Sequence, residues 1–165
     1  MIRWLSICAL ASLMACGGGA RKPPAASPAP VAAGDASPAA IDSLWHQAEQ
    51  AVRHGKWSEA EKHLNRAVLE FAPGDPRIAQ AHFFLGEALY AQGRHLEAAR
   101  EFRKASDETP NDPIAPEALL RLGDVYSDLW RRPELDPTYG QTALSTYQEL
   151  LNRYPDSAAA KRAHE

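Results

Sequence analysis

The sequence predicts an all-α fold: a short solenoid of about three helix-turn-helix repeats followed by a C-terminal capping helix. From residue 41 onward, apolar residues recur with helical spacing, and no run of Val, Ile and Thr predicts a strand. Proline, glycine and Asp-Pro pairs interrupt this pattern at regular intervals. One motif also returns at a fixed offset of 37 residues: Asp75-Pro76, Ala81 and Leu85-Gly86 are followed by Asp112-Pro113, Ala118 and Leu122-Gly123.

The first 16 residues have the layout of an export signal. Arg3 precedes an apolar stretch from Trp4 to Met14, which is too short to cross a hydrocarbon core of about 30 Å as a helix. The stretch ends in Leu13-Met14-Ala15-Cys16, which resembles the lipobox of bacterial lipoproteins. The resemblance implies a signal peptide over residues 1–15, cleavage before Cys16, and a lipid on Cys16 that anchors the chain to a membrane. Gly17 after the cysteine implies the periplasmic face of the outer membrane.

Two alternatives to the lipobox stay open, namely an ordinary signal peptide cut near Ala15 and an uncleaved anchor. Residues 16–40 follow as a Pro- and Ala-rich segment with five prolines between residues 20 and 40. Such a composition buries too little apolar surface to offset the entropy of ordering, so we expect a disordered tether. The tether is either an extended spacer from the membrane or a linker of no particular length.

The body, residues 41–165, divides into three hairpins, at about 41–74, 75–111 and 112–155. The second reads Leu85-Gly86-x2-Leu89, then Ala98-x3-Phe102 and Pro110. This pattern resembles the tetratricopeptide repeat (TPR), a helix-turn-helix unit of about 34 residues. The resemblance implies close helix contacts at the small residues, with a large side chain filling the gap beside them. These positions are Ala48, Ala60 and Leu64 in the first hairpin, Gly86, Ala98 and Phe102 in the second, and Gly123, Ala143 and Tyr147 in the third.

The third hairpin carries an insertion of eight residues around positions 130–137. Residues 156–165 then form the expected cap, with Asp156 or Ser157 as the helix N-cap. At the other hairpins, Gly55 and Gly93 are expected to close the first helices.

Charge and cysteine content exclude several classes of function. The net charge of −3 argues against nucleic acid as a partner, since that needs a basic surface. Cys8 and Cys16 leave no room for a disulfide framework or a zinc site. The six histidines lack metal-ligand spacing, and no phosphate loop or nucleophile elbow is present, so we expect no catalytic residues, no metal and no cofactor.

The TPR resemblance implies a concave groove lined by the first helix of each unit, which would bind a protein partner. Equivalent carboxylates and equivalent apolar residues would form two ladders, suited to a peptide or helix with apolar anchors and Lys or Arg. The alternative is that these side chains are solvated or pack between units. The expected groove residues are Trp45, Glu49 and Val52, then Phe83, Glu87 and Tyr90, then Leu120, Asp124 and Ser127.

A second candidate surface is the insertion, where Trp130, Arg131 and Arg132 could anchor a partner or a lipid surface. The alternative is that Trp130 packs under the loop. The junction Tyr154-Pro155-Asp156-Ser157 resembles that of BamD-like outer-membrane lipoproteins and the related Tol-Pal cell-division coordinators, although this chain has fewer repeats.

Together these resemblances imply a non-catalytic, membrane-anchored TPR adaptor of the bacterial cell envelope, with outer-membrane protein assembly as one pathway. A pilotin-like assembly factor for a pilus or secretion system, and a peptidoglycan or cell-division coordinator subunit, are the alternatives.

Overall fold

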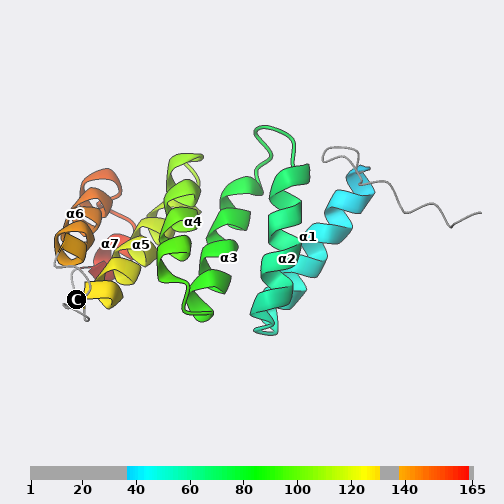
Figure 1. The fold of residues 1–165 in the computed structure, drawn as a ribbon. Coiled ribbons are helices and arrows are strands. Elements are labelled where there is room, and N and C mark those ends of the chain that lie inside the picture. Colours follow the sequence, from blue (N-terminus) through cyan, green and yellow to red (C-terminus); the bar gives the residue numbers. More distant parts are fainter. Residues whose placement is uncertain (1–36, 131–137, 164–165) are drawn as a thin grey trace, which may run out of the picture. The chain divides into compact units, whose positions relative to one another are not determined.

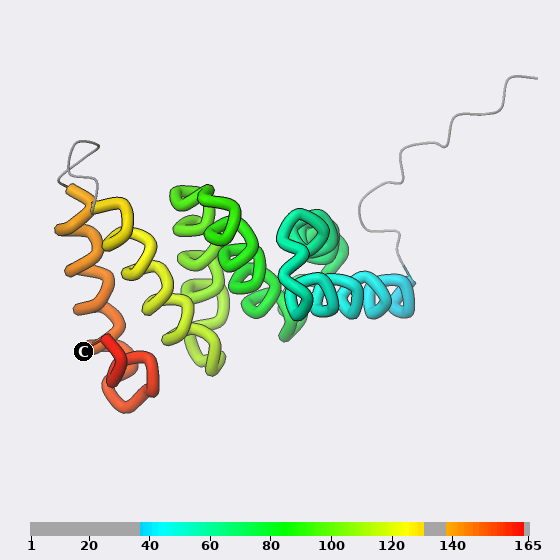
Figure 2. Tube along the Cα trace, turned by 90° about the horizontal axis from the view of Figure 1, so that it is seen from below, coloured from blue at the N-terminus to red at the C-terminus, as the bar shows by residue number. Residues whose placement is uncertain are grey.

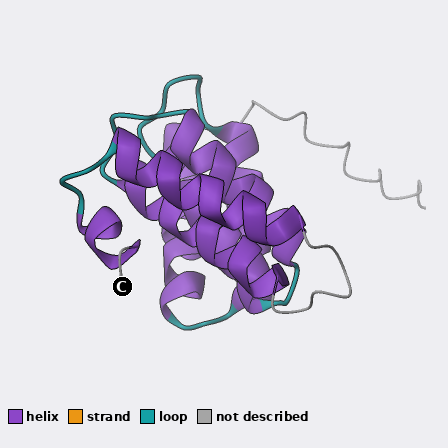
Figure 3. Ribbon diagram, turned by 90° about the vertical axis from the view of Figure 1, so that its left-hand side faces the viewer, coloured by secondary structure: helices purple, strands orange, loops and turns teal. Residues whose placement is uncertain are grey.

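The computed structural model describes residues 37–130 and 138–163, and all regular secondary structure in these ranges is helical (Figures 1 and 3). They lie in one compact unit, Ala32–Glu165. The all-α prediction is thereby confirmed. The helices are α1 (Pro38–Arg53), α2 (Trp57–Glu70), α3 (Ile78–Ala91), α4 (His95–Asp107), α5 (Ile114–Trp130), α6 (Thr138–Arg153) and α7 (Ala158–Ala163).

The helices form three hairpins and a cap, which we number repeat one (α1 and α2), repeat two (α3 and α4) and repeat three (α5 and α6). Each helix packs against the next one in the chain, as the tube in Figure 2 shows. The first helices α3 and α5 also contact each other, and α7 packs on both α5 and α6. The predicted solenoid of about three repeats with a C-terminal capping helix is therefore present.

Local capping explains where the first and last helices begin. The Ser37 hydroxyl accepts a hydrogen bond from the Ala40 N–H at 3.3 Å, and Pro38 occupies the first helical turn, where a missing N–H is tolerated. Residues 38–40, which the composition assigned to the tether, are consequently helical, and that boundary was wrong. At the other end, the Ser157 hydroxyl accepts from the Ala160 N–H at 3.0 Å and caps α7.

The predicted turns have a physical basis in two residue types. Gly55 and Gly93 follow the first helices with φ of +64° and +76°, the left-handed region in which glycine is strongly favoured. Asp75 and Asp112 lie at equivalent places between repeats, and each carboxylate accepts the N–H two residues later, at 2.9 and 2.8 Å. The repeated Asp-Pro motif thus sets the same turn before α3 and before α5.

Small residues bring the two helices of a repeat together, as the pattern predicted. A Cβ placed on Gly86 would lie 2.7 Å from the Phe102 ring, and one on Gly123 would clash with the Tyr147 ring. In repeat one, Ala48 and Leu64 hold the equivalent places and are fully buried. The aromatic side chain therefore fills the space that the missing Cβ leaves.

The insertion in repeat three lies between α5 and α6. Helix α5 continues two residues beyond the position equivalent to Ala91, the last residue of α3. Residues 131–137 lie outside the described residues, and with them the predicted surface residues Arg131 and Arg132.

Candidate partner-binding face

The predicted groove residues come from α1, α3 and α5, and we call the surface they form the first-helix face. At the junction of repeats one and two it is aromatic. The Trp45 ring stacks on Phe84 at a centroid distance of 6.0 Å and tilts against Phe71 at 5.9 Å. Phe83 lies beside Phe84 at 6.2 Å and meets Phe102 edge-on at 5.6 Å. Trp45 thus packs against the next repeat, in agreement with the alternative that the groove side chains pack between units.

At the junction of repeats two and three the same face is ionic. The Arg121 Nε and Nη2 atoms donate to the two carboxylate oxygens of Glu87 at 2.5 and 3.1 Å, and Nη1 lies 3.4 Å from Asp124. The guanidinium also lies over the Tyr90 ring, 4.8 Å from its centroid. Burial opposes the charge of Arg121, but the hydrogen bonds to Glu87 and the nearby carboxylates outweigh it and raise its pKa.

A polar pocket of about 260 Å³ opens next to this pair. Its tyrosines bind its carboxylates: Tyr90 donates its hydroxyl to Asp128, and Tyr147 donates to Asp124 at 2.8 Å. The hydrogen bond to Asp128 raises the pKa of Tyr90, and burial followed by the bond to Asp124 raises that of Tyr147, so both hydroxyls stay protonated donors. The pocket is lined by Tyr90, Arg121, Asp124, Ser127, Asp128 and Tyr147.

Two details of the predicted ladders were wrong. Leu120, the expected third apolar anchor, is only 7% exposed and belongs to the core, because α4, α6 and α7 all pack against α5. The carboxylates of Glu87 and Asp124 do not form a row of open acceptors, since Arg121 and Tyr147 bind them. Of the three equivalent carboxylates, Glu49 alone has no hydrogen bond or ion pair within residues 37–130 and 138–163.

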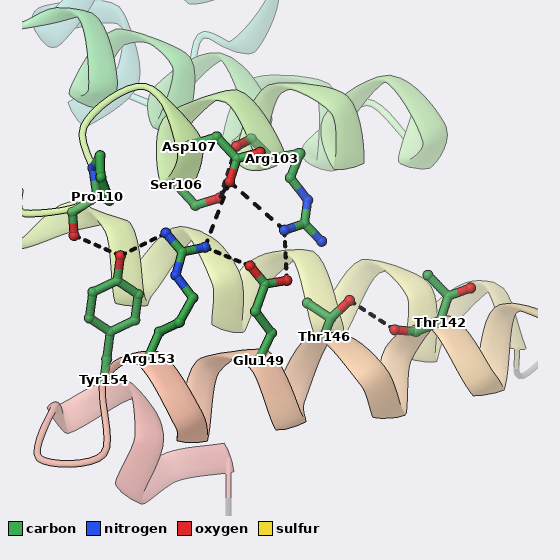
Figure 4. A network of polar contacts seen from close by, with 9 residues as sticks. All are labelled: Arg103, Ser106, Asp107, Pro110, Thr142, Thr146, Glu149, Arg153 and Tyr154. Carbon is green, nitrogen blue, oxygen red and sulfur yellow. Dashed lines mark hydrogen bonds and ion pairs between the residues drawn. The ribbon is translucent and has the colours of Figure 1, made fainter.

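The second helices carry a separate polar network at the same junction, shown in Figure 4. Glu149 of α6 lies 2.8 Å from Arg103 of α4 and 2.6 Å from Arg153 of its own helix. Asp107 lies 3.9 and 3.7 Å from the same two arginines. Tyr154 donates to the Pro110 carbonyl at 2.7 Å. Repeats two and three are therefore joined by polar contacts on both helix layers.

Trp130, the described member of the second predicted surface, ends α5. Its indole lies against Gly140 of α6, where an added Cβ would approach it to 2.8 Å, and the residue is 52% exposed. The indole is therefore packed against α6 on one side, and about half of the residue stays accessible.

A histidine-lined pocket is a further feature of repeat one. His46, His54 and His63 line a pocket of about 240 Å³ between α1 and α2. In the part of the chain that the structure describes, however, no three His, Cys, Asp or Glu side chains are placed to hold a metal ion. No helix in these ranges is both long and apolar enough to cross a bilayer.

Comparison with known families agrees with this geometry. Two models described as tetratricopeptide repeat match the chain, one over residues 47–113 and the other over residues 117–157. This chain carries a tetratricopeptide repeat domain. No curated protein matches it. TPR domains are protein-interaction scaffolds, in which stacked repeats present an extended binding surface.

The sequence analysis missed three residues of the first-helix face: Phe84, Arg121 and Asp128. The repeat pattern aligns equivalent positions, whereas the contacts between repeats join non-equivalent positions. Glu87 and Arg121, for example, are 34 residues apart. A search for oppositely charged residues separated in sequence by slightly less than one repeat would have found this pair.

Proposed function

We propose that this chain is a lipid-anchored TPR adaptor of the bacterial cell envelope, which binds a protein partner on its first-helix face and has no catalytic role of its own. The TPR repeats support protein binding. The lipobox-like residues Leu13 to Cys16 support a lipid anchor at the outer membrane, and the Pro-rich segment after them supports a tether.

The observation that carries the binding surface is the composition of the first-helix face. Phe83, Phe84 and Trp45 form a continuous aromatic group there that is only partly buried. The pocket around Tyr90 and Asp124 lies on the same face and is polar. An aromatic surface next to fixed hydrogen-bonding groups is the composition of binding hot spots. A peptide or helix with apolar anchors and basic residues fits both parts.

Photo-crosslinking in the intact envelope tests this surface. A photoreactive amino acid at Tyr90 should capture a defined protein, whereas the same group at Leu69, which is 67% exposed on the second helix α2, should not. A barrel-assembly, secretin or cell-wall protein in the adduct would assign the pathway. Equal adducts at both positions, or none at Tyr90, would exclude the first-helix face.

The anchor has its own test. Cys16→Ser should abolish incorporation of a labelled fatty acid and release the chain from the membrane fraction. Retained label in this variant would refute the lipoprotein assignment, while leaving the binding face untouched.

A further inference from the structure

Glu49 of α1 has no hydrogen bond or ion pair to any cation among the described residues. It is the counterpart of Glu87, which Arg121 of the next repeat binds through two hydrogen bonds. The residue at the Arg121 place one repeat earlier is Phe84, whose ring stacks on Trp45 instead. Arg53, one turn further along α1, is exposed and forms no ion pair with Glu49 in the described residues. The first-helix face therefore has an equivalent carboxylate in repeats one and two, but an arginine to bind it only in the second case.

The molecule itself shows how this face holds a guanidinium. Arg121 places two N–H donors on one carboxylate and its plane over the Tyr90 ring. Around Glu49 the same two kinds of group are present. Trp45 lies one turn earlier on the same side of α1, and the stacked Phe84 ring extends this aromatic surface across to α3. The described residues place no cation on Glu49.

We propose that the junction of repeats one and two binds an arginine side chain of the protein partner, with its guanidinium on the Glu49 carboxylate and beside the Trp45–Phe84 pair. The inference rests on the proposed function, because it names the partner chemistry that the first-helix face recognises. Arginine fits better than lysine, because its planar fork reaches both carboxylate oxygens and its face stacks on aromatic rings. We call this place the Glu49 subsite.

A small probe tests the Glu49 subsite directly. The full chain in detergent micelles is titrated with N-acetyl-arginine methylamide, and its backbone amide signals are followed by NMR. The Glu49 and Phe84 signals should move, and binding should weaken about tenfold both with the uncharged citrulline analogue and in Glu49→Gln. Glu59→Gln is the matched control, because Glu59 is exposed on α2 and pairs with Lys56 at the surface. Equal binding of the citrulline analogue, or unchanged binding in Glu49→Gln, would overturn the proposal.

The chain's own tether is the competing occupant, since it contains Arg21. If that side chain filled the subsite, Arg21→Ala would bind the probe more tightly than the wild type, and the assignment to a partner would be overturned. Unchanged affinity in Arg21→Ala supports an external arginine.

The two proposals fail in different ways. If the partner is captured at Tyr90 equally well in wild type and in Glu49→Gln, the arginine subsite is wrong and the adaptor function stands. If the adduct weakens about tenfold in Glu49→Gln but not in Glu59→Gln, the partner uses the subsite. If nothing is captured at Tyr90 while the probe still distinguishes arginine from citrulline, the adaptor surface is wrong and the guanidinium site remains.

Discussion

The two junctions of this solenoid join equivalent helices with different chemistry. Between repeats one and two, Trp45 packs against Phe71 and Phe84, and Arg77 lies over the Phe71 ring while pairing with Asp42. Between repeats two and three, Arg121 binds Glu87 on the first helices and Arg103 binds Glu149 on the second. The hydrophobic burial of the rings depends little on pH and salt, whereas the ion pairs depend on both.

This difference between the junctions indicates where a carboxylate remains available to a partner. The ionic junction pairs its carboxylates with arginines from the neighbouring repeat. The aromatic junction is held by ring contacts and by the Arg77–Asp42 and Arg94–Glu61 ion pairs, none of which involves Glu49. In repeat proteins, stability is approximately a sum over units and their neighbouring interfaces, so each junction can be weakened separately.

The largest effect is expected from Phe84→Ala. Removing the ring opens a space beside Trp45 and should lower the free energy of unfolding by about 3 kcal/mol. Urea denaturation followed by circular dichroism measures the loss, and hydrogen exchange should show faster opening of α1 and α2 than of α5 to α7. Leu69→Ala is the control, because Leu69 is exposed and should change stability by less than about 0.5 kcal/mol. Equal loss of protection in all helices would contradict independent junctions.

Arg121→Ala should have the next largest effect, about 2 kcal/mol, because it leaves the partly buried Glu87 without its cation. Here the loss of protection should appear in α5 to α7. The comparison variant is Arg100→Ala, which removes an exposed arginine whose side-chain hydrogen bond goes to a backbone carbonyl of its own helix. Similar destabilisation by both variants would mean that the Glu87 pair contributes nothing specific.

Contacts within a repeat could be predicted from the pattern of a single repeat, and contacts between repeats could not. The pairing of Gly86 with Phe102 follows from one repeat unit read against its family pattern. The pairing of Glu87 with Arg121 depends on how two units stack, which the spacing inside one unit does not state. For the same reason, the repeat pattern predicts Leu120 as an exposed anchor, although neighbouring helices bury it.

The start of α1 was missed for a local reason. Residues 38–40 share the Pro and Ala composition of the segment before them, and a single serine side chain decides that the helix begins there. Composition averaged over 20 residues does not detect one cap.

Acid should weaken the ionic junction more than the aromatic one. Burial raises the pKa of Glu149, but the hydrogen bonds from Arg103 and Arg153 outweigh burial and lower it below the ordinary glutamate value of about 4.3. A lowered folded-state pKa stabilises the fold above the unfolded value, and this contribution is lost as the pH falls through the folded one. Between about pH 5 and pH 3 the free energy of unfolding should therefore fall more in wild type than in Glu149→Gln. The difference should be under about 1 kcal/mol. Identical pH profiles would show that the network does not contribute.

The smallest effect on stability is expected from Glu49→Gln, and this is the most informative contrast with the equivalent Glu87→Gln. Glu87 is bound by Arg121, so neutralising it should cost about 1 kcal/mol, whereas Glu49 has no partner in the described residues, and its variant should stay within about 0.5 kcal/mol of wild type. Paired urea titrations measure both. A carboxylate that costs nothing to neutralise in the free protein but weakens partner capture acts in binding and not in folding. A cost at Glu49 as large as that at Glu87 would instead give it a structural role.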